Sequence, residues 1–432
     1  MQRENKTVRN TITKGVLAAA LAGLAPPALA DTAETKGGLT VKTDDGRFEM
    51  KIGGRIHFDT YVVDEDRSAT FGSNTLLDQG GTAFRRTYLT ITGKAYGWKY
   101  KFENDFAAGA SPGSYREMWV STEALGGEVV IGQFKPFRGM EELTSSNEIT
   151  LIERPVTSAT GIYSGRQFLM GLGYKGIAGD MFGYQAAVQS LSPAGTGPTE
   201  GIHYGGRFYV APMRDDGGAL HIGLSASVDD EGPASSAASP AFGYAGRRGP
   251  VMNFGNAGSA VAANLDGESQ TTLAVEVGSS FGPVTLQAEV AQATLDNTHL
   301  SGGNPADSDV LAYYLQASWF ITGERASYKI DRGAFGKPKP LGENGAWELA
   351  ARYETIENSD DDGTVAVCTI TTGAAGTFAT GNECVATVAT AGLNWYVNPN
   401  VRFMLNYYMG EGSNGLTKDQ PEAVTLRTQF SF

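Results

Sequence analysis

The sequence predicts an all-β protein: a transmembrane antiparallel β-barrel of about sixteen strands. Three observations lead to this prediction. Apolar and polar residues alternate in short runs from Phe48 to Phe432, glycine makes up about 13% of the chain against an average near 7%, and short and long connections alternate between the runs. After residue 30 no stretch approaches the ~18 consecutive apolar residues of a membrane-spanning helix, so a helical membrane protein is excluded.

The first thirty residues have the pattern of an export signal. Four basic residues precede a short apolar stretch over residues 15–22, and Ala28-Leu29-Ala30 reads as a cleavage site. Cleavage removes four basic residues and one acidic residue, which changes the formal net charge from −13 to −16 and disfavours nucleic acid as a partner. We expect three parts: a cleaved signal over 1–30, a short periplasmic segment over 31–46, and the barrel over 47–432.

Alternation with a period of two is clearest between Trp98 and Phe106, where aromatic residues occupy one face and charged residues the other. Such a strand separates lipid from water, and runs of about ten residues have the length that a tilted membrane strand needs. One such run also suits a half-buried strand of a sandwich, but repetition favours a barrel. The runs lie near residues 47–63, 82–95, 97–107, 115–123, 127–135, 166–176, 180–191, 203–212, 218–229, 269–281, 283–296, 309–322, 345–356, 385–397, 401–410 and 422–432.

The connections alternate as they do in bacterial outer-membrane barrels, with short periplasmic turns and long external loops. Residues 96–97, 282–283 and 398–400 read as tight turns. The long connections are polar or rich in glycine and serine, and they cover residues 64–81, 136–165, 230–268, 297–308, 323–344 and 357–384. Closing the sheet pairs every backbone group, so a barrel is the multi-strand structure that lipid allows.

The chain ends on a strand that finishes Phe430-Ser431-Phe432. A final amphipathic strand with a terminal aromatic residue is expected to be recognised by the barrel assembly machinery. Together with the export signal, it predicts that the protein lies in the lipid of the outer membrane of a Gram-negative bacterium.

Several segments resemble the phosphate-selective porin O and P family. The run Phe84-Arg85-Arg86-Thr87-Tyr88-Leu89 matches the family's second strand, with its paired arginines followed by a tyrosine. Residues 131–137, 141–147 and 153–155 look like a strand of the family and its inward-folding third loop, and residues 322–325, 345–353 and 392–398 look like its C-terminal signatures. The resemblance implies a sixteen-stranded trimer whose lumen conducts anions past arginines, lysines and loop serines, with one long loop folded into that lumen.

Strand parity gives candidates for that constriction. With Leu89 and Ile91 toward lipid, Arg86 and Tyr88 face the lumen, and a bulge would turn Arg85 inward, as the resemblance suggests. Cations on the lumen face lower the cost of dehydrating a passing anion. The candidate constriction consists of Arg85, Arg86, Tyr88, Lys99, Lys101, Lys135, Ser145 and Ser146.

Later strands carry arginines at or near polar-face positions, and these would form a ladder that guides anions. The alternative is that they pair with wall carboxylates such as Glu117, Glu348 or Glu354 and stiffen the barrel. Spacing does not distinguish these readings. The ladder candidates are Arg166, Arg207, Arg352, Arg402 and Arg427.

Some features of the sequence argue against selectivity for phosphate, and one argument favours it. Where phosphate-selective members of the family place a basic residue before the loop serines, this chain has Met140-Glu141-Glu142-Leu143-Thr144, and Asp360-Asp361-Asp362 lies in an outer loop. Salt screens loop charge over ~8 Å, so the lumen can stay anion-selective under an acidic rim. Two functions remain open: a channel for phosphate or related anions, and a general or organic-solute porin. Residues 329–339 form either a cationic funnel or a solvated loop.

Cys368 and Cys384, the chain's two cysteines, lie in one long loop of an exported protein, which predicts a disulfide between them. No histidine lies near them to suggest a metal site, and no cofactor motif with the right context occurs. The four histidines show no H-x-x-x-H spacing and no G-x-S-x-G elbow is present, so we expect no enzyme activity. A barrel enzyme or an adhesin is the competing class.

Overall fold

The computed structural model describes most of the strand-forming chain. The signal predicted over residues 1–30 lies outside the described residues except for Ala30, and Arg166 also lies outside them. Within the described part, no helix is both long and apolar enough to cross a membrane. The described residues are 30–34, 38–64, 79–108, 114–158, 162, 168–191, 201–231, 241–254, 268–296, 308–358, 368–372, 376–377, 384–413 and 418–432.

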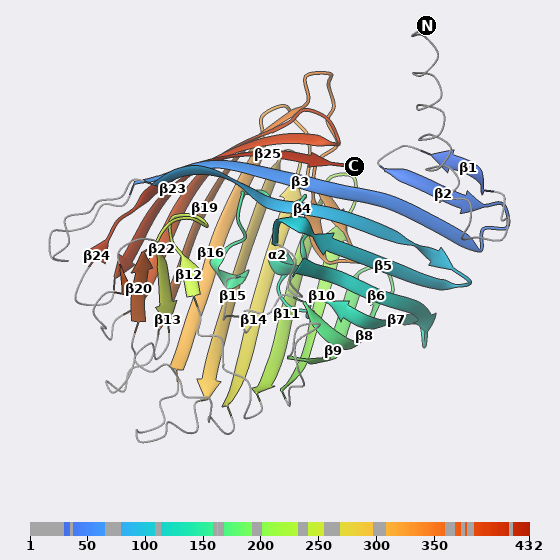
Figure 1. The fold of residues 1–432 in the computed structure, drawn as a ribbon, viewed down its shortest axis with the longest axis horizontal. Coiled ribbons are helices and arrows are strands. Elements are labelled where there is room, and N and C mark those ends of the chain that lie inside the picture. The colour runs from blue at the N-terminus through green and yellow to red at the C-terminus, as the bar shows by residue number, and fades with distance from the viewer. Residues whose placement is uncertain are drawn as a thin grey trace, which may run out of the picture.

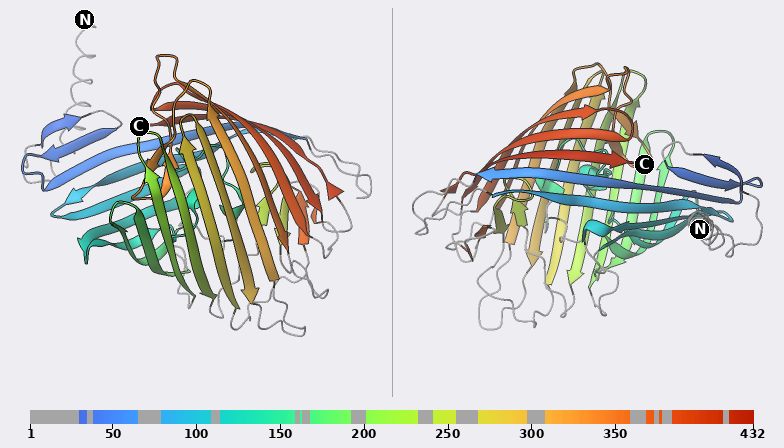
Figure 2. Two further views of the ribbon diagram at one scale, coloured as in Figure 1. Left: turned by 180° about the vertical axis from the view of Figure 1, so that it is seen from behind. Right: turned by 45° about the horizontal axis from the view of Figure 1, so that its top comes forward.

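Sixteen long antiparallel strands form a closed barrel (Figures 1 and 2). Each strand pairs with the next along the chain, and the last pairs with the first, which removes every long free edge. The barrel strands are β3 (Phe48–Asp64), β4 (Gln79–Ala95), β5 (Trp98–Asp105), β6 (Tyr115–Ala124), β7 (Gly127–Phe134), β8 (Leu169–Ala178), β9 (Phe182–Ser190), β10 (Ile202–Arg214), β11 (Gly218–Glu231), β14 (Glu268–Phe281), β15 (Val284–Asp296), β16 (Ser308–Phe320), β19 (Ala346–Asn358), β22 (Val385–Tyr396), β23 (Val401–Ser413) and β25 (Glu422–Ser431).

The sixteen strands confirm the sixteen runs predicted from alternation, with boundaries within three residues. The alternation has the expected physical origin, because successive side chains point to opposite faces of the wall. Along β16, Gln316 and Ser318 are buried toward the lumen, whereas Leu315 and Trp319 are exposed on the outside. The outer face is therefore apolar and the inner face polar, as a membrane barrel requires.

Closure of the barrel depends on a glycine beside the last residue. Phe432 and Gly54 exchange two backbone hydrogen bonds of 2.9 and 3.1 Å. A Cβ atom on Gly54 would lie 2.5 Å from the carbonyl oxygen of Tyr88 and 2.8 Å from the Phe432 ring. The seam therefore fits only a residue without a side chain at position 54.

Short turns occupy one end of the barrel, which we call the turn end. At the turn between β4 and β5, Tyr96 and Gly97 have φ values of 51° and 88°, the left-handed pair typical of a tight hairpin. Beyond the barrel proper, β1 (Ala30–Glu34) pairs with β2 (Leu39–Thr43), and β2 pairs with the start of β3. The segment predicted as a short N-terminal extension thus includes a two-stranded addition to the sheet.

The connection between β16 and β19 corrects one prediction. Residues 323–344 were expected to form an external loop, but they lie at the turn end, because the backbone of Phe320 bonds to Pro283 in the turn between β14 and β15. Consecutive strands run antiparallel, so their connections alternate between the two ends of the barrel, whatever the length of each connection. The segment includes a small hairpin of β17 (Ser327–Lys329) and β18 (Ala334–Gly336), called here the turn-end hairpin (residues 327–336).

The opposite end, the loop end, carries a second small sheet built from two external loops. It contains β12 (Ala241–Gly243), β13 (Val251–Phe254), β20 (Cys368–Thr372) and β21 (Gly376–Thr377). Short β24 (Lys418–Asp419) extends the barrel wall there. Cys384 is buried and disulfide-bonded; its pairing with Cys368, whose side chain lies outside the described part, stays a prediction.

Candidate functional site

The lumen is narrowed by the loop between β7 and β8 (residues 135–168), called here the constriction loop. It folds inward and contains α2 (Met140–Leu143), whose short helix is seen inside the barrel in Figure 1, and the single turn η4 (Val156–Ser158). Another single turn, η2 (Phe106–Ala108), follows β5. Met140, Leu151 and Val156 are fully buried. The apolar side of the loop therefore packs on the wall, and its polar side remains for the pore.

Three wall arginines hold the backbone of the constriction loop. Arg402 donates to the carbonyl oxygens of Ile149 and Thr150 at 2.8 Å, and Arg427 donates to that of Ile152 at 2.6 Å. Arg352 donates to the next carbonyl, of Glu153, at 3.1 Å. Five donors in a planar guanidinium suit this task, because one side chain can reach two successive carbonyls.

Two wall carboxylates bind backbone N–H groups of the same loop. Glu289 accepts hydrogen bonds from the backbone N–H groups of Met140 and Glu141 at 3.1 and 2.8 Å, where α2 begins. Glu354 accepts from Val156 N–H at 2.7 Å, where η4 begins. These contacts satisfy N–H groups that no helical turn can satisfy, so they fix both turns of the loop.

The predicted ladder arginines therefore have structural partners wherever the structure describes them. Arg352 pairs with Glu354 at 3.0 Å, and Arg427 forms a two-pronged pair with Asp59 at 2.6 and 2.7 Å. Arg207 pairs with Glu276 and also donates to the carbonyl oxygens of Arg332 and Gly333 in the turn-end hairpin. These arginines are thus paired with wall carboxylates, as the second of the two interpretations expected. They also bind the backbone of the segments that fold into the lumen.

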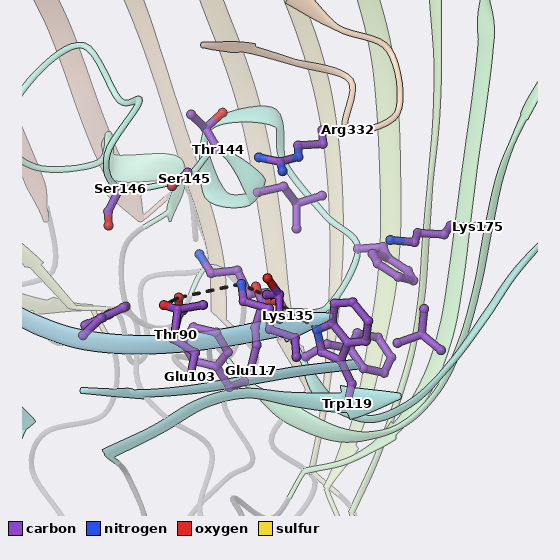
Figure 3. A pocket seen from close by; sticks show the side chains of 18 of the residues that line it. Thr90, Glu103, Glu117, Trp119, Lys135, Thr144, Ser145, Ser146, Lys175 and Arg332 are labelled. Atoms are coloured by element: carbon purple, nitrogen blue, oxygen red, sulfur yellow. Dashed lines mark hydrogen bonds and ion pairs between the residues drawn. The ribbon is translucent and has the colours of Figure 1, made fainter. Parts of the chain in front are cut away.

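A cavity of about 490 Å³ lies between the constriction loop and the wall formed by β3 to β8. Figure 3 shows the loop residues Thr144, Ser145 and Ser146 on one side and strand residues on the other, with Arg332 of the turn-end hairpin at its edge. Six of the eight predicted constriction residues line it, namely Arg86, Tyr88, Lys101, Lys135, Ser145 and Ser146.

The lining of this cavity contains more basic than acidic side chains. Seven basic residues line it against three acidic ones, Glu103, Glu117 and Asp331. Two of the acids are committed to cations, since Lys101 lies 2.7 Å from Glu117 and Arg55 lies 3.0 Å from Glu103. The basic residues are Arg55, Arg86, Lys101, Lys135, Arg154, Lys175 and Arg332.

Arg86 is the least neutralised of these cations. It is only 5% exposed, and its Nη1 atom is buried without a hydrogen-bond partner among the described residues. Arg55 directs its Nη1 to the hydroxyl of Ser146 at 2.8 Å and lies over the Tyr88 ring at 4.6 Å. Unsatisfied buried donors are rare, so Arg86 keeps a hydrogen-bond donor that no described residue occupies.

The bulge predicted at Arg85 is present, because the register between β3 and β4 shifts between His57 and Phe58 and skips this residue. Both arginines thereby turn inward, but to different places. Arg85 makes two hydrogen bonds to Glu153 of the constriction loop at 2.8 and 2.9 Å. Burial alone would raise the pKa of Glu153, but Arg85 and Arg427 hold it well below its ordinary value.

Lys135 begins the constriction loop and contacts Glu142, which is 2.6 Å away. Burial lowers the pKa of Lys135 to about 8; Arg154 acts in the same direction, and Glu142 opposes both. Burial alone would raise the pKa of Glu142, but Lys135 and Arg154 lower it. The acidic pair before the loop serines is thus partly neutralised within the loop.

Lys99 does not join this cavity. It lies in a second cavity of about 590 Å³ toward the turn end, with Glu123 and Glu128 at 3.7 and 3.6 Å. Lys175 and Asp331 line both cavities, so the two are adjacent along the pore.

Residues 329–339 also differ from the predicted funnel. Lys329 pairs with Glu148 of the constriction loop, and Arg332 lies 3.7 Å from the same carboxylate. Lys337 donates to the Pro399 carbonyl. The segment is therefore not an external funnel: the turn-end hairpin folds back into the barrel, while Asp331 and Arg332 remain exposed.

Sequence reasoning missed several cations near the pore. Arg55 is on the lumen face of β3, and parity identifies it once the strand is recognised. Arg247 and Arg248 lie with Arg85 and Glu153 around a small cavity on the other side of the constriction loop. Only the fold of an external loop brings this pair inward. Among the described residues, no cluster of His, Cys, Asp or Glu has the arrangement of a metal site.

Comparison with known proteins agrees with this architecture. The phosphate-selective porin O and P family matches residues 50–432. Porin O of Pseudomonas aeruginosa is 28% identical over 452 aligned residues, which cover 98% of each chain.

Solved structures share the barrel. A loop-deletion variant of OmpT of Vibrio cholerae has a TM-score of 0.56 at 10% identity, covering 89% of this chain and 100% of its own. An anion-selective porin from Comamonas acidovorans has a TM-score of 0.54 at 12% identity, with the same coverage. The match over nearly the whole barrel shows that this chain is a porin of the Gram-negative outer membrane and belongs to the phosphate-selective porin O and P family.

Proposed function

We propose that this porin is a passive channel without catalytic activity that admits phosphate or related small anions, and that it binds them in the positive cavity under the constriction loop. The observation that carries the proposal is the excess of basic over acidic residues around this cavity, together with the unpartnered buried donor of Arg86. Relatives named for phosphate and anion selectivity support the same assignment.

The cavity offers phosphate a complementary set of donors. Arg86 supplies a guanidinium whose planar donors can meet two oxygens, and Arg55 and Ser146 lie on the same cavity. Fixed positive charge at this position compensates a passing anion for lost hydration. Lys101 and Lys135 are paired with carboxylates, so they attract the anion electrostatically rather than through direct contacts.

On the loop-end side, Arg247 and Arg248 provide a first attraction for anions. Both are exposed, and Arg248 lies over the Tyr61 ring at 5.5 Å. An anion at this position would meet the mouth cations before it reaches Arg86 on the other side of the constriction loop.

Single-channel recording in planar bilayers tests the proposal. A KCl gradient reports ion selectivity, and added phosphate reports binding through block of the chloride current. We expect anion preference, block by phosphate, and a roughly tenfold higher half-blocking concentration in Arg86→Ala, which loses a charged hydrogen-bond donor.

Arg47→Ala is the matched control, because Arg47 pairs with Asp45 near the turn end, away from the pore. It should behave as the wild type. Cation preference, or absence of phosphate block in the wild type, would leave a general or organic-solute porin on the same scaffold. A barrel without conductance would revive the enzyme and adhesin alternatives.

We also propose that the channel assembles as a homotrimer in outer-membrane lipid and that the barrel assembly machinery recognises the strand ending at Phe432. A solved trimeric form of OmpT of Vibrio cholerae supports this proposal, because its barrel has the same fold. Mass determination of the native complex in detergent checks the subunit number.

A further inference from the structure

One side of the cavity is aromatic. Tyr88, Trp119 and Phe168 line it as half-buried rings, and Phe134 and Phe137 lie behind them in contact with each other at 5.3 Å between ring centroids. Lumen faces of porins are predominantly polar. Trp119 packs against the buried cluster of Phe134 and Phe137, but Trp119, Tyr88 and Phe168 all keep part of their surface at the cavity.

Each of the three rings has a cation over it. Arg55 is 4.6 Å from the centre of the Tyr88 ring, and Lys175 is 6.0 Å from that of Trp119. Lys135 lies 5.6 Å from the centre of the Phe168 ring. The cavity thus repeats one arrangement three times, with a positive charge over a partly exposed aromatic ring.

Leu143 faces the same cavity from α2 of the constriction loop, and both Trp119 of β6 and Lys135 of the loop line it, as Figure 3 shows. A ring that stacks on Trp119 or Phe168 would hold an attached carboxylate near Lys175 or Lys135. Stacking on an aromatic face adds affinity that small inorganic anions cannot gain.

We propose that this cavity also selects organic anions that carry an aromatic ring, with aromatic monocarboxylates as the substrate class. The proposal deepens the anion-channel function above and rests on it. The rings supply specificity for the body of the solute, and the cations supply specificity for its charge. Inorganic phosphate uses the cations alone.

The test measures block of the chloride current by benzoate, cyclohexanecarboxylate, acetate and phosphate in the full-length channel. We expect the half-blocking concentration of benzoate to be about tenfold lower than that of acetate, with cyclohexanecarboxylate between them. Trp119→Leu and Phe168→Leu should each raise the benzoate value at least threefold and leave the phosphate value unchanged. Trp119→Phe should retain most of the benzoate block.

Trp319→Leu serves as the matched control, because Trp319 is exposed on the lipid face of β16. A wild-type open-channel conductance shows that a variant has folded. The proposal is overturned if benzoate and acetate block equally, or if the ring variants weaken benzoate and phosphate alike, since the rings would then only position the cations. In either case anion preference and phosphate block would persist, whereas their loss would remove the underlying channel function.

Discussion

Two adjacent arginines in β4 have opposite electrostatic roles. Arg85 is neutralised by Glu153, whereas Arg86 has no carboxylate among the described residues within ion-pair distance. The bulge makes this division possible, since it turns both side chains inward but aims them at opposite sides of the constriction loop. Charge at the pore therefore depends on pairing as much as on the number of basic residues.

Arg85→Ala should reduce the anion-to-cation permeability ratio even though Arg85 lies outside the main cavity. Glu153 keeps its charge, because Arg427 still lies 3.1 Å away, and its negative field then acts on the pore with less compensation. Arg85→Ala combined with Glu153→Ala should recover most of the ratio, as measured by reversal potentials in a KCl gradient. Equal ratios in the single and double variants would contradict this pairing.

Lys135 predicts a pH dependence. It is positive below its pKa of about 8 and neutral above it, so anion selectivity should be higher at pH 7 and decline as the pH rises through 8. Reversal potentials between pH 6.5 and 9.5 would show the decline, and Lys135→Met should give a lower, flatter curve. A wild-type decline that Lys135→Met reproduces in full would assign the titration to another group.

At the scale of elements, the constriction loop has little regular structure of its own. Its position comes from wall side chains that meet its backbone, with arginines on carbonyl groups and Glu289 and Glu354 on N–H groups. These contacts on both carbonyl and N–H groups fix the position of the loop, and this position sets the shape of the pore.

Arg402→Ala should therefore loosen the loop. It removes two charged hydrogen bonds, each worth about 1.5–3 kcal/mol, to Ile149 and Thr150. We expect larger mean conductance and noisier open-channel current in bilayers, with Arg47→Ala unchanged. If Arg402 instead belonged to a conducting ladder, its loss would lower anion selectivity without added noise.

The whole molecule is closed by the pairing of β25 with β3. This seam joins residues more than 350 positions apart in sequence and leaves no room for a side chain at Gly54. Closure also sets the lumen into which the constriction loop and the turn-end hairpin fold, so the pore exists only in the finished barrel.

Gly54→Val should impair closure, because its Cβ would meet the Tyr88 carbonyl and the Phe432 ring. The fraction of protein that migrates as the compact, heat-sensitive form on gels should fall well below that of the wild type. Gly342→Ala is the control, since a Cβ there meets nothing within 4 Å. Normal folding of Gly54→Val would show that the seam can adjust.

Sequence by itself determined the strands, their faces and the family. Alternation is a local property, so it located sixteen strands, and parity placed Arg86, Tyr88 and Lys101 toward the lumen. Tertiary structure decided which charges remain available to a solute. Arg352, Arg402 and Arg427 have the same local pattern as Arg86, and only the path of the constriction loop makes them anchors. The side of residues 323–344 was likewise fixed by strand order, because the length of a connection does not specify the end of the barrel at which it lies.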